Sequence, residues 1–322
     1  EGYNVAIGGA ARDTITVTGT ATDSQGIVLG DNGTLTLAVN GSLVSIASSD
    51  YDQGDEDTIQ LTSGTNTVIG GVGADAITAG SGTNTVLGDD GEATFSGGRL
   101  QLIRSTNSDQ GADDQIVLED GTNTVVAGDG QDTVTMGAGT NIVLGDEGSL
   151  RVNGNGTTTI QTINASAGDK DTIEIGEGYN VVLGGAASDT ITVTGTATDS
   201  QGIVLGDNGT LTLAADGSLA SIASSDYASG AADLIELTSG TNTVIGSVGA
   251  DTITAGGGAN VVLGDDGEAT FAAGKLISIK SSNSNGGADD KITLEDGTNT
   301  VVAGAGQDTV TIGTGTNIVL GD

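Results

Sequence analysis

Residues 64–81 read GTNTVIGGVGADAITAGS, an 18-residue stretch with two short apolar runs and two Gly-rich turns. A partner stretch begins GTNTVLGD at residues 82–89 and resumes as GADDQIVLED at residues 111–120, so eight and ten residues again make 18. Val, Ile and Thr dominate the apolar runs, which favours strands. Two strands and two turns per 18-residue period predict an all-β fold, a parallel β-roll or β-solenoid in which each period forms one rung.

Stacked rungs align equivalent side chains into ladders. One ladder consists of Val28, Val68, Val86, Val125, Val143, Val204, Val244, Val262, Val301 and Val319. The ladder of the opposite sheet consists of Ile15, Ile59, Ile77, Ile116, Val134, Ile173, Ile191, Ile235, Ile253, Ile292 and Val310. These β-branched residues are expected to face each other across a narrow core. With rungs about 4.8 Å apart, eleven or twelve of them predict a rod about 55 Å long. The strict phase of both ladders argues against disorder.

A longer period of 176 residues lies over the rungs, because Glu1-Gly-Tyr-Asn4 returns as Glu177-Gly-Tyr-Asn180. The first long repeat is predicted at residues 1–176, with units 2–63, 64–120 and 121–177. The second is predicted at residues 177–322 and is truncated, with units 178–239, 240–296 and 297–322. We expect one continuous solenoid. Since the chain begins without Met and stops within a unit, we expect it to be a processed or excised piece of a longer array.

Every second rung carries an insertion, at residues 32–53, 90–110, 147–167, 208–229 and 266–286. The insertions are predicted to be β-hairpins, since Thr34–Leu37 and Leu43–Ile46 flank Asn40-Gly41, a strong turn signal. Hairpins that emerge about 10 Å apart are expected to contact each other and form a second layer. Five of the eight basic residues lie in the insertions: Arg99, Arg104, Arg151, Lys275 and Lys280. These charges indicate either protection of strand edges or contact with acidic surfaces of neighbouring rods.

Composition excludes several classes of function. The chain has 43 Asp and Glu against 8 Lys and Arg, a net charge of −35, and no Cys, His, Pro or Trp. It therefore lacks the residues for a disulfide framework, a zinc site or a catalytic imidazole. The negative charge argues against nucleic acid and anionic membranes as partners. No apolar run approaches the roughly 20 residues of a membrane span, so membrane insertion is not expected.

Residues 70–78 read GGVGADAIT, which resembles the calcium-binding nonapeptide of the RTX family, G-G-x-G-x-D-x-U-x. Related stretches occupy residues 127–135, 246–254 and 303–311, and weaker ones residues 8–16 and 184–192. The resemblance implies that such turns stack, with calcium between successive turns on one edge. It also implies that backbone carbonyls and the motif Asp supply the oxygen ligands, which suit a hard cation.

The resemblance assigns the metal-ligand role to the motif aspartates. The best candidates are Asp75, Asp132, Asp251 and Asp308, where the turns are closest to the motif. Asp57, Asp114, Asp171 and Asp290 stand at the same position in rungs with an insertion, and Asp233 continues the ladder. Asp13 and Asp189 are expected to be weaker, because Ala11 and Ala187 replace a Gly. The alternative is that these aspartates cap turns by accepting backbone N–H groups.

The half-turn on the opposite edge reads GTN, which places Asn where the motif has Asp. This Asn ladder consists of Asn4, Asn66, Asn84, Asn123, Asn141, Asn180, Asn242, Asn260, Asn299 and Asn317, and Gly26 and Gly202 interrupt it. Asn amides are expected to hydrogen-bond along the solenoid edge. A second interpretation is a regular surface of Thr-Asn pairs, similar to RTX-type ice-binding regions.

Near-identical tandem copies suit a structural spacer, since a single active site would break the repetition. We therefore predict no enzymatic activity and a calcium-stabilised segment of a long adhesin, surface or filament protein. The RTX resemblance implies secretion and folding in extracellular calcium. The predicted partners are further repeats of the same array, other copies of the chain, and a cell-surface or matrix ligand. The alternatives are a module that binds a ligand or glycan through its hairpin tips and a carbohydrate-active enzyme with acidic pairs such as Asp113 and Asp114.

Overall fold

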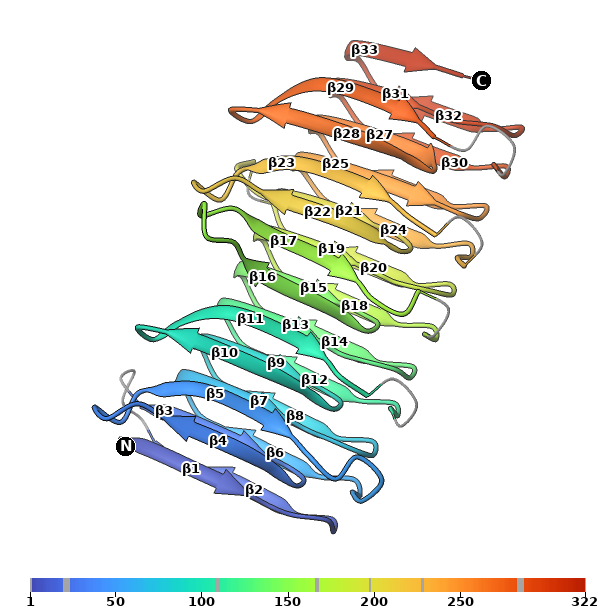
Figure 1. Cartoon of the computed structure of the whole chain (residues 1–322). Coiled ribbons are helices and arrows are strands. Elements are labelled where there is room, and N and C mark those ends of the chain that lie inside the picture. The colour runs from blue at the N-terminus through green and yellow to red at the C-terminus, as the bar shows by residue number, and fades with distance from the viewer. Residues whose placement is uncertain are drawn as a thin grey trace.

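The computed structural model describes residues 2–19, 24–107, 111–165, 168–196, 198–226, 229–282 and 287–321. Short stretches of the predicted insertions, such as 108–110 and 283–286, lie outside the described residues. The described chain is all strand and turn, arranged as a rod built from three β-sheets (Figure 1). No described segment is a helix able to span a membrane. The predicted β-solenoid is confirmed.

Two parallel sheets form the solenoid itself. Sheet A contains β1 (Tyr3–Ile7), β3 (Gln25–Leu29), β7 (Gly64–Ile69), β9 (Gly82–Leu87), β13 (Gly121–Val126), β15 (Gly139–Leu144), β19 (Gly178–Leu183), β21 (Gln201–Leu205), β25 (Gly240–Ser247), β27 (Gly258–Asp265), β31 (Gly297–Val302) and β33 (Gly315–Leu320). Sheet B contains β2 (Thr14–Val17), β6 (Thr58–Leu61), β8 (Ala76–Ala79), β12 (Gln115–Leu118), β14 (Thr133–Met136), β18 (Thr172–Ile175), β20 (Thr190–Val193), β24 (Leu234–Leu237), β26 (Thr252–Ala255), β30 (Lys291–Leu294) and β32 (Thr309–Ile312). The pairing keeps equivalent residues together, such as Val68 with Val86.

The core between sheets A and B is the one that the two ladders predict. The residues of both ladders are buried in a single cluster, except in the end rungs, where Ile15 and Val310 are partly buried and Val319 is half exposed. Val182, absent from the predicted ladder, joins the same cluster. A thin core of β-branched side chains therefore runs the length of the rod, and each rung buries its apolar residues only against its neighbours.

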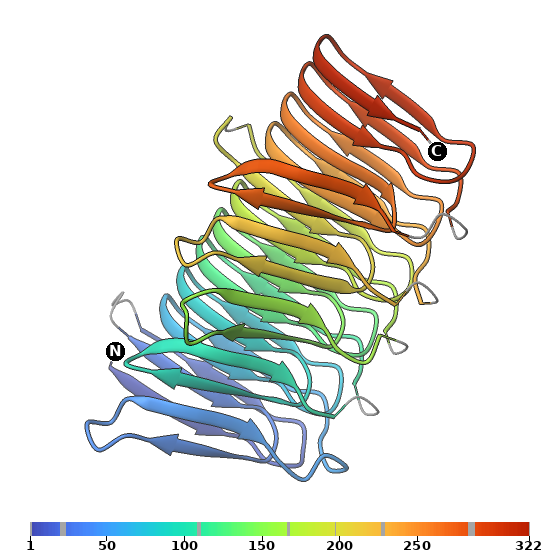
Figure 2. The same cartoon turned by 45° about the horizontal axis from the view of Figure 1, so that its top comes forward.

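The insertions form a third sheet instead of separate hairpins. Sheet C contains, in spatial order, β4 (Gly33–Leu37), β5 (Leu43–Ser48), β10 (Gly91–Ser96), β11 (Arg99–Ser105), β16 (Gly148–Val152), β17 (Thr158–Thr162), β22 (Gly209–Leu213), β23 (Leu219–Ser224), β28 (Gly267–Ala272) and β29 (Lys275–Ser281). Each hairpin also pairs antiparallel with the next one, so the expected contact between hairpins is confirmed (Figure 2). Two hairpin strands per two rungs give sheet C the same strand spacing as the solenoid.

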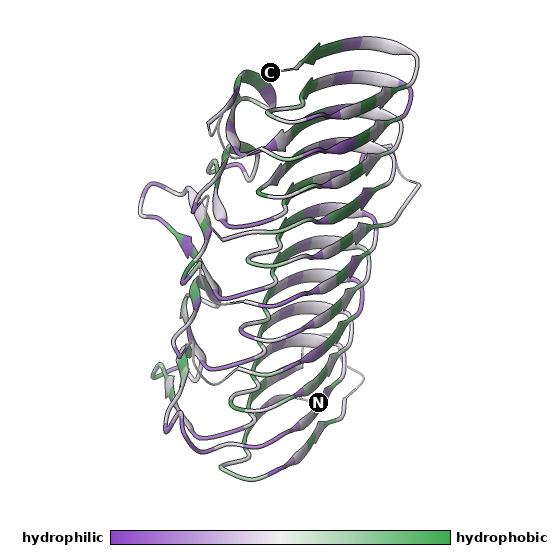
Figure 3. Ribbon diagram, turned by 90° about the vertical axis from the view of Figure 1, so that its right-hand side faces the viewer, coloured by the Kyte–Doolittle hydropathy of each residue, from purple (hydrophilic) through white to green (hydrophobic). Residues whose placement is uncertain are grey.

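Sheet C covers the outer face of sheet A and creates a second core (Figure 3). Outward side chains of sheet A, such as Leu87 and Leu144, pack there against Ile103 and Leu150 of sheet C. Sheet A is therefore buried on both faces, which explains its near-continuous apolar runs. The predicted layer of hairpins is thus one continuous sheet.

The Asn ladder on the edge opposite the motif aspartates is a hydrogen-bonded column, as predicted. Asn84 donates from Nδ2 to Asn123 Oδ1 at 2.8 Å and to the Gly80 carbonyl at 3.1 Å. Asn123 repeats this pattern with Asn141 at 2.9 Å. Because these Asn side chains are at most 3% exposed from Asn66 to Asn299, they are not available to a surface of Thr-Asn pairs.

The same edge contains a column of positions that only Gly can occupy. Gly121 has φ of +154°, and a Cβ there would lie 2.1 Å from the carbonyl oxygen of Gly82 in the preceding rung. Gly41 in the first hairpin turn also has positive φ, +84°, but a Cβ there would meet nothing within 4 Å. A side chain at either position would strain the backbone, but only a side chain at Gly121 would also clash with the neighbouring rung.

We therefore expect Gly121→Ala to lower the free energy of unfolding by about 3 kcal/mol or more, and Gly41→Ala by about 1 kcal/mol, the ordinary cost of a left-handed non-Gly residue. Urea denaturation followed by circular dichroism measures both. Equal losses for the two variants would contradict the stacked contact between Gly121 and Gly82.

Candidate metal centre

The turns that lead from sheet A to sheet B all lie on one edge of the rod, and they alternate between two kinds. Intact turns run directly between the two strands, as in residues 70–75, GGVGAD. Interrupted turns contain the hairpin insertion, as in Gly88-Asp89 followed, after the hairpin, by residues 111–114. Both kinds end in a motif aspartate directly before a strand of sheet B, so the parallel stacking brings all the predicted metal ligands into one ladder.

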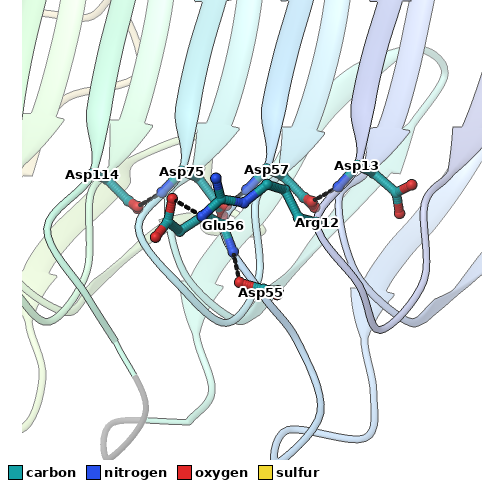
Figure 4. Close-up of polar contacts among 7 residues, drawn as sticks. All are labelled: Arg12, Asp13, Asp55, Glu56, Asp57, Asp75 and Asp114. Carbon is teal, nitrogen blue, oxygen red and sulfur yellow. Dashed lines mark hydrogen bonds and ion pairs between the residues drawn. The ribbon is translucent and has the colours of Figure 1, made fainter.

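The motif aspartates form a continuous hydrogen-bonded ladder, here named the ladder aspartates. In each step the backbone N–H of one ladder aspartate donates to Oδ1 of the next, for example Asp57 to Asp75 and Asp75 to Asp114, both at 2.7 Å (Figure 4). The full ladder comprises Asp13, Asp57, Asp75, Asp114, Asp132, Asp171, Asp189, Asp233, Asp251, Asp290 and Asp308. Turn capping, the alternative role, is thus performed by one carboxylate oxygen.

The second carboxylate oxygen has no hydrogen-bond donor. From Asp57 to Asp290, Oδ2 of every ladder aspartate is buried and unpaired. Except at Asp132, whose turn begins with Ala127, each of these Oδ2 atoms lies beside the first Gly of its own turn and beside a carbonyl oxygen of the next rung. A Cβ on Gly70 would lie 2.3 Å from Asp75 Oδ2 and 2.2 Å from the Gly88 carbonyl oxygen. Only Gly leaves these two oxygens free to face the same narrow space.

Burial without a neutralising partner is costly for a carboxylate, and the pKa values show this. Desolvation, together with the charges of neighbouring carboxylates, raises the pKa of Asp75 to about 9 and that of Asp251 to about 10. Burial followed by the charges of Asp89 and Asp132 raises the pKa of Asp114 well above its usual range. At neutral pH these groups must therefore be protonated or be neutralised by a cation.

The oxygens of this ladder fit calcium. Calcium prefers six to eight oxygen ligands, and carboxylate and backbone carbonyl oxygens are typical donors. The unpaired Asp75 Oδ2 beside the Gly88 carbonyl supplies both kinds. Within the described residues no three acidic side chains gather into a conventional carboxylate cage, so backbone carbonyls would have to complete any site, as the RTX resemblance implies. Calcium bound there would neutralise the buried charges.

Not all turns keep the open space beside Oδ2. At the register position of Gly70, two intact turns carry Ala127 and Ala303 instead, next to Asp132 and Asp308. By register, their methyl groups stand where a Cβ on Gly70 would meet Oδ2 and the next carbonyl oxygen. Ala127 and Ala303 stand at the first Gly position of the stretches 127–135 and 303–311, which suggested Asp132 and Asp308 as strong candidates.

The two weaker candidates differ from the others as expected from their sequences. Ala187, in the turn of Asp189, adopts φ of +71°, a conformation that favours Gly. Arg12, next to Asp13, does not contact that carboxylate but pairs with Glu56 of the next rung (Figure 4). Which of the ten candidate aspartates bind calcium stays a prediction.

Sequence reasoning missed a second row of aspartates, here named the bridging aspartates: Asp31, Asp89, Asp146, Asp207 and Asp265. Each stands in an interrupted turn, where most intact turns have Gly. Each is buried and accepts a backbone N–H from the next rung, such as Val72 for Asp31 and Asp129 for Asp89, both at 2.7 Å. The signal was present in the sequence, as a Gly-Asp pair before every insertion.

Comparison with protein families finds the RTX calcium-binding nonapeptide repeat in four copies, at residues 54–95, 111–149, 237–270 and 285–320. These regions contain Asp57, Asp75, Asp114, Asp132, Asp251, Asp290 and Asp308, whereas Asp13, Asp171 and Asp189 lie outside them. No curated protein and no solved structure matches the chain.

Proposed function

Because the chain carries RTX calcium-binding nonapeptide repeats, whose cofactor is calcium, we propose that it is a calcium-stabilised structural segment of a long extracellular adhesin, surface or filament protein. The observation that carries the proposal is the unbroken ladder of buried carboxylates with unpaired Oδ2 atoms. A ladder of this kind serves the whole length of the rod and provides no single reaction centre.

The mechanical continuity of the fold supports a spacer role. Sheets A, B and C each run through the described rungs with parallel register or hairpin-to-hairpin pairing at every step. Force along the rod is therefore shared by two apolar cores and the backbone bonds of three sheets. The repetition also argues against catalysis, since every rung offers the same groups.

We place this segment outside the cell, where millimolar calcium can neutralise a chain of net charge −35. Inside a cell, scarce free calcium would leave the carboxylates unneutralised and the chain extended. Further repeats of the same array, or other copies of the chain, are the proposed partners, because a solenoid extends by stacking equivalent repeats.

Small-angle scattering of the purified chain tests this function. In millimolar calcium we expect an elongated particle with the β-rich circular dichroism of the structure, and after chelation an expanded chain. A compact particle, or the same rod with and without calcium, would contradict the proposal. A salt series distinguishes single rods from rods that associate through their acidic and basic surfaces.

A further inference from the structure

Consecutive turns on the aspartate edge meet in two kinds of junction. In the first kind an interrupted turn precedes an intact turn, and a bridging aspartate lies between them. In the second kind an intact turn precedes an interrupted turn. The position equivalent to the bridging aspartate is then Gly or Ser, as at Gly71 and Ser247. The rod therefore alternates between junctions with and without this extra carboxylate.

In four of the five bridging aspartates both carboxylate oxygens accept backbone N–H groups, whereas Asp31 Oδ1 has no hydrogen-bond partner. Asp207 accepts N–H groups from Val248 of the next rung at 2.8 Å and from Ala231 at 3.1 Å. Asp265 accepts from Ala305 at 2.5 Å and from Ala288 at 3.1 Å. Amide hydrogens that converge on one point form an anion site. These amides hold the carboxyl oxygens in place and leave them less free to bind a metal ion. They do not make the surroundings positive, because burial and the charges of Asp132 and Asp75 raise the pKa of Asp89 to about 9.

The bridging carboxylate also fills its junction. A Cβ on Gly128 would lie 2.2 Å from Asp89 Oδ2, and a Cβ on Gly304 would lie 2.2 Å from Asp265 Oδ2. The carboxylate thus packs directly against the glycine of the next turn, at the place where two successive RTX-type turns would otherwise face each other.

This arrangement also explains why an acid is needed before each insertion. The chain leaves the rung after Asp89 and returns at Gly111, and Asp89 Oδ1 accepts the N–H of Ala112 at 3.4 Å. Asp89 therefore joins the two ends of the interrupted turn to each other and to the next rung. This tie holds the base of the hairpin without a metal ion.

We propose that the bridging aspartates, held by backbone amides and packed against the next turn, take the place of calcium at every second junction, so that calcium binds only where an intact turn precedes an interrupted one. The inference rests on the proposed calcium function. Five complete junctions of the second kind exist, and in one of them Ala127 fills the space beside Asp132. The remaining four begin at Gly8, Gly70, Gly184 and Gly246, where Oδ2 of Asp13, Asp75, Asp189 and Asp251 lies beside a carbonyl oxygen of the next rung.

The test counts calcium ions. The full chain is stripped with a chelator, titrated with calcium alone by isothermal calorimetry, and weighed with its bound ions by native mass spectrometry. We expect four calcium ions per chain. Asp75→Asn and Asp89→Asn form a matched pair, because both replace one buried carboxyl group in neighbouring rungs. Asp75→Asn is expected to lose one ion, whereas Asp89→Asn is expected to keep all four and to unfold at a lower temperature.

A variant that gains a calcium ion tests the inference without relying on variants that lose stability. Ala127→Gly is expected to open the fifth junction and raise the number of bound calcium ions to five. Ala138→Gly, on the opposite edge, is the control that leaves this number at four.

Binding of about one calcium ion at every junction of both kinds in the wild type, or loss of an ion in Asp89→Asn, would overturn the inference while supporting the calcium function. If the wild type binds no calcium, the proposed function itself fails. If Asp89→Asn does not fold, the numbers of calcium ions bound by the wild type and by Ala127→Gly still test the inference.

Discussion

Without calcium, the rod is expected to lose stability as the pH rises from about 4 to about 9, and to unfold near neutral pH. In the folded rod burial raises the pKa of Asp75 to about 9 and that of Asp233 to about 8, from an ordinary value of 3.8. The folded state therefore holds protons that the unfolded chain releases. Its advantage is fully present below pH 4 and is lost as the pH approaches the raised pKa values.

The expected effect is large because many carboxyls contribute. Each carboxyl that holds an extra proton contributes about 1.4 kcal/mol per pH unit between its two pKa values, and desolvation raises the pKa of most ladder aspartates. Calcium reverses the trend, since it binds the ionised form and competes with protons. Calcium dependence should therefore be weak at pH 5 and strong at pH 8.

Thermal unfolding followed by circular dichroism at pH 5, 6.5 and 8 measures this effect, with millimolar calcium or with a chelator. Magnesium at the same concentration is the control for general charge screening, because it demands a smaller and more regular site. A chelated chain that is more stable at pH 8 than at pH 5 would contradict the role assigned to the buried carboxylates. So would equal stabilisation by magnesium and calcium.

The solenoid could be predicted from the sequence because its signals are strictly periodic. Val86, Val125 and Val143 recur in the same phase as the turns, and any other register would expose them. Sheet C was harder to predict. Its hairpins were visible as turn signals such as Asn40-Gly41, but the pairing of β5 with β10 joins segments whose sequences carry no shared period. That pairing follows from a geometric match between hairpin width and rung spacing.

The candidate metal site, too, could be predicted only in part from the sequence. The nonapeptide located the ladder aspartates, because their position in the motif is fixed. It did not show that Oδ1 and Oδ2 would take different roles, since this depends on the stacking of Asp57 on Asp75. The nonapeptide motif also did not identify Asp89, because the motif has no aspartate at the position before an insertion. The role of Asp89 depends on amides that come from Ala112 and Asp129, which only the fold brings together.

Val86→Asp is expected to lower the free energy of unfolding by about 5 kcal/mol, the range that marks a buried, unpaired charge. Val86 is 0% exposed and packs within the cluster between sheets A and B. The matched control is Val319→Asp, because Val319 stands at the same ladder position in the last rung but is 50% exposed. We expect it to cost less than about 1 kcal/mol.

The comparison also tests how far the rungs depend on one another. In a solenoid, each rung is stabilised mainly by its two neighbours, so a broken rung at β9 separates the three sheet A strands before it from the eight that follow. Sheet C opposes this separation, because the hairpin β10–β11 of the broken rung pairs with β5 on one side and with β16 on the other. Hydrogen exchange of Val86→Asp is therefore expected to show the first three rungs opening together with β4 and β5, while later rungs keep their protection.

Uniform loss of protection would mean that the three sheets unfold as one cooperative unit. Equal losses of free energy of unfolding in Val86→Asp and Val319→Asp would show that Val86 does not lie in the core.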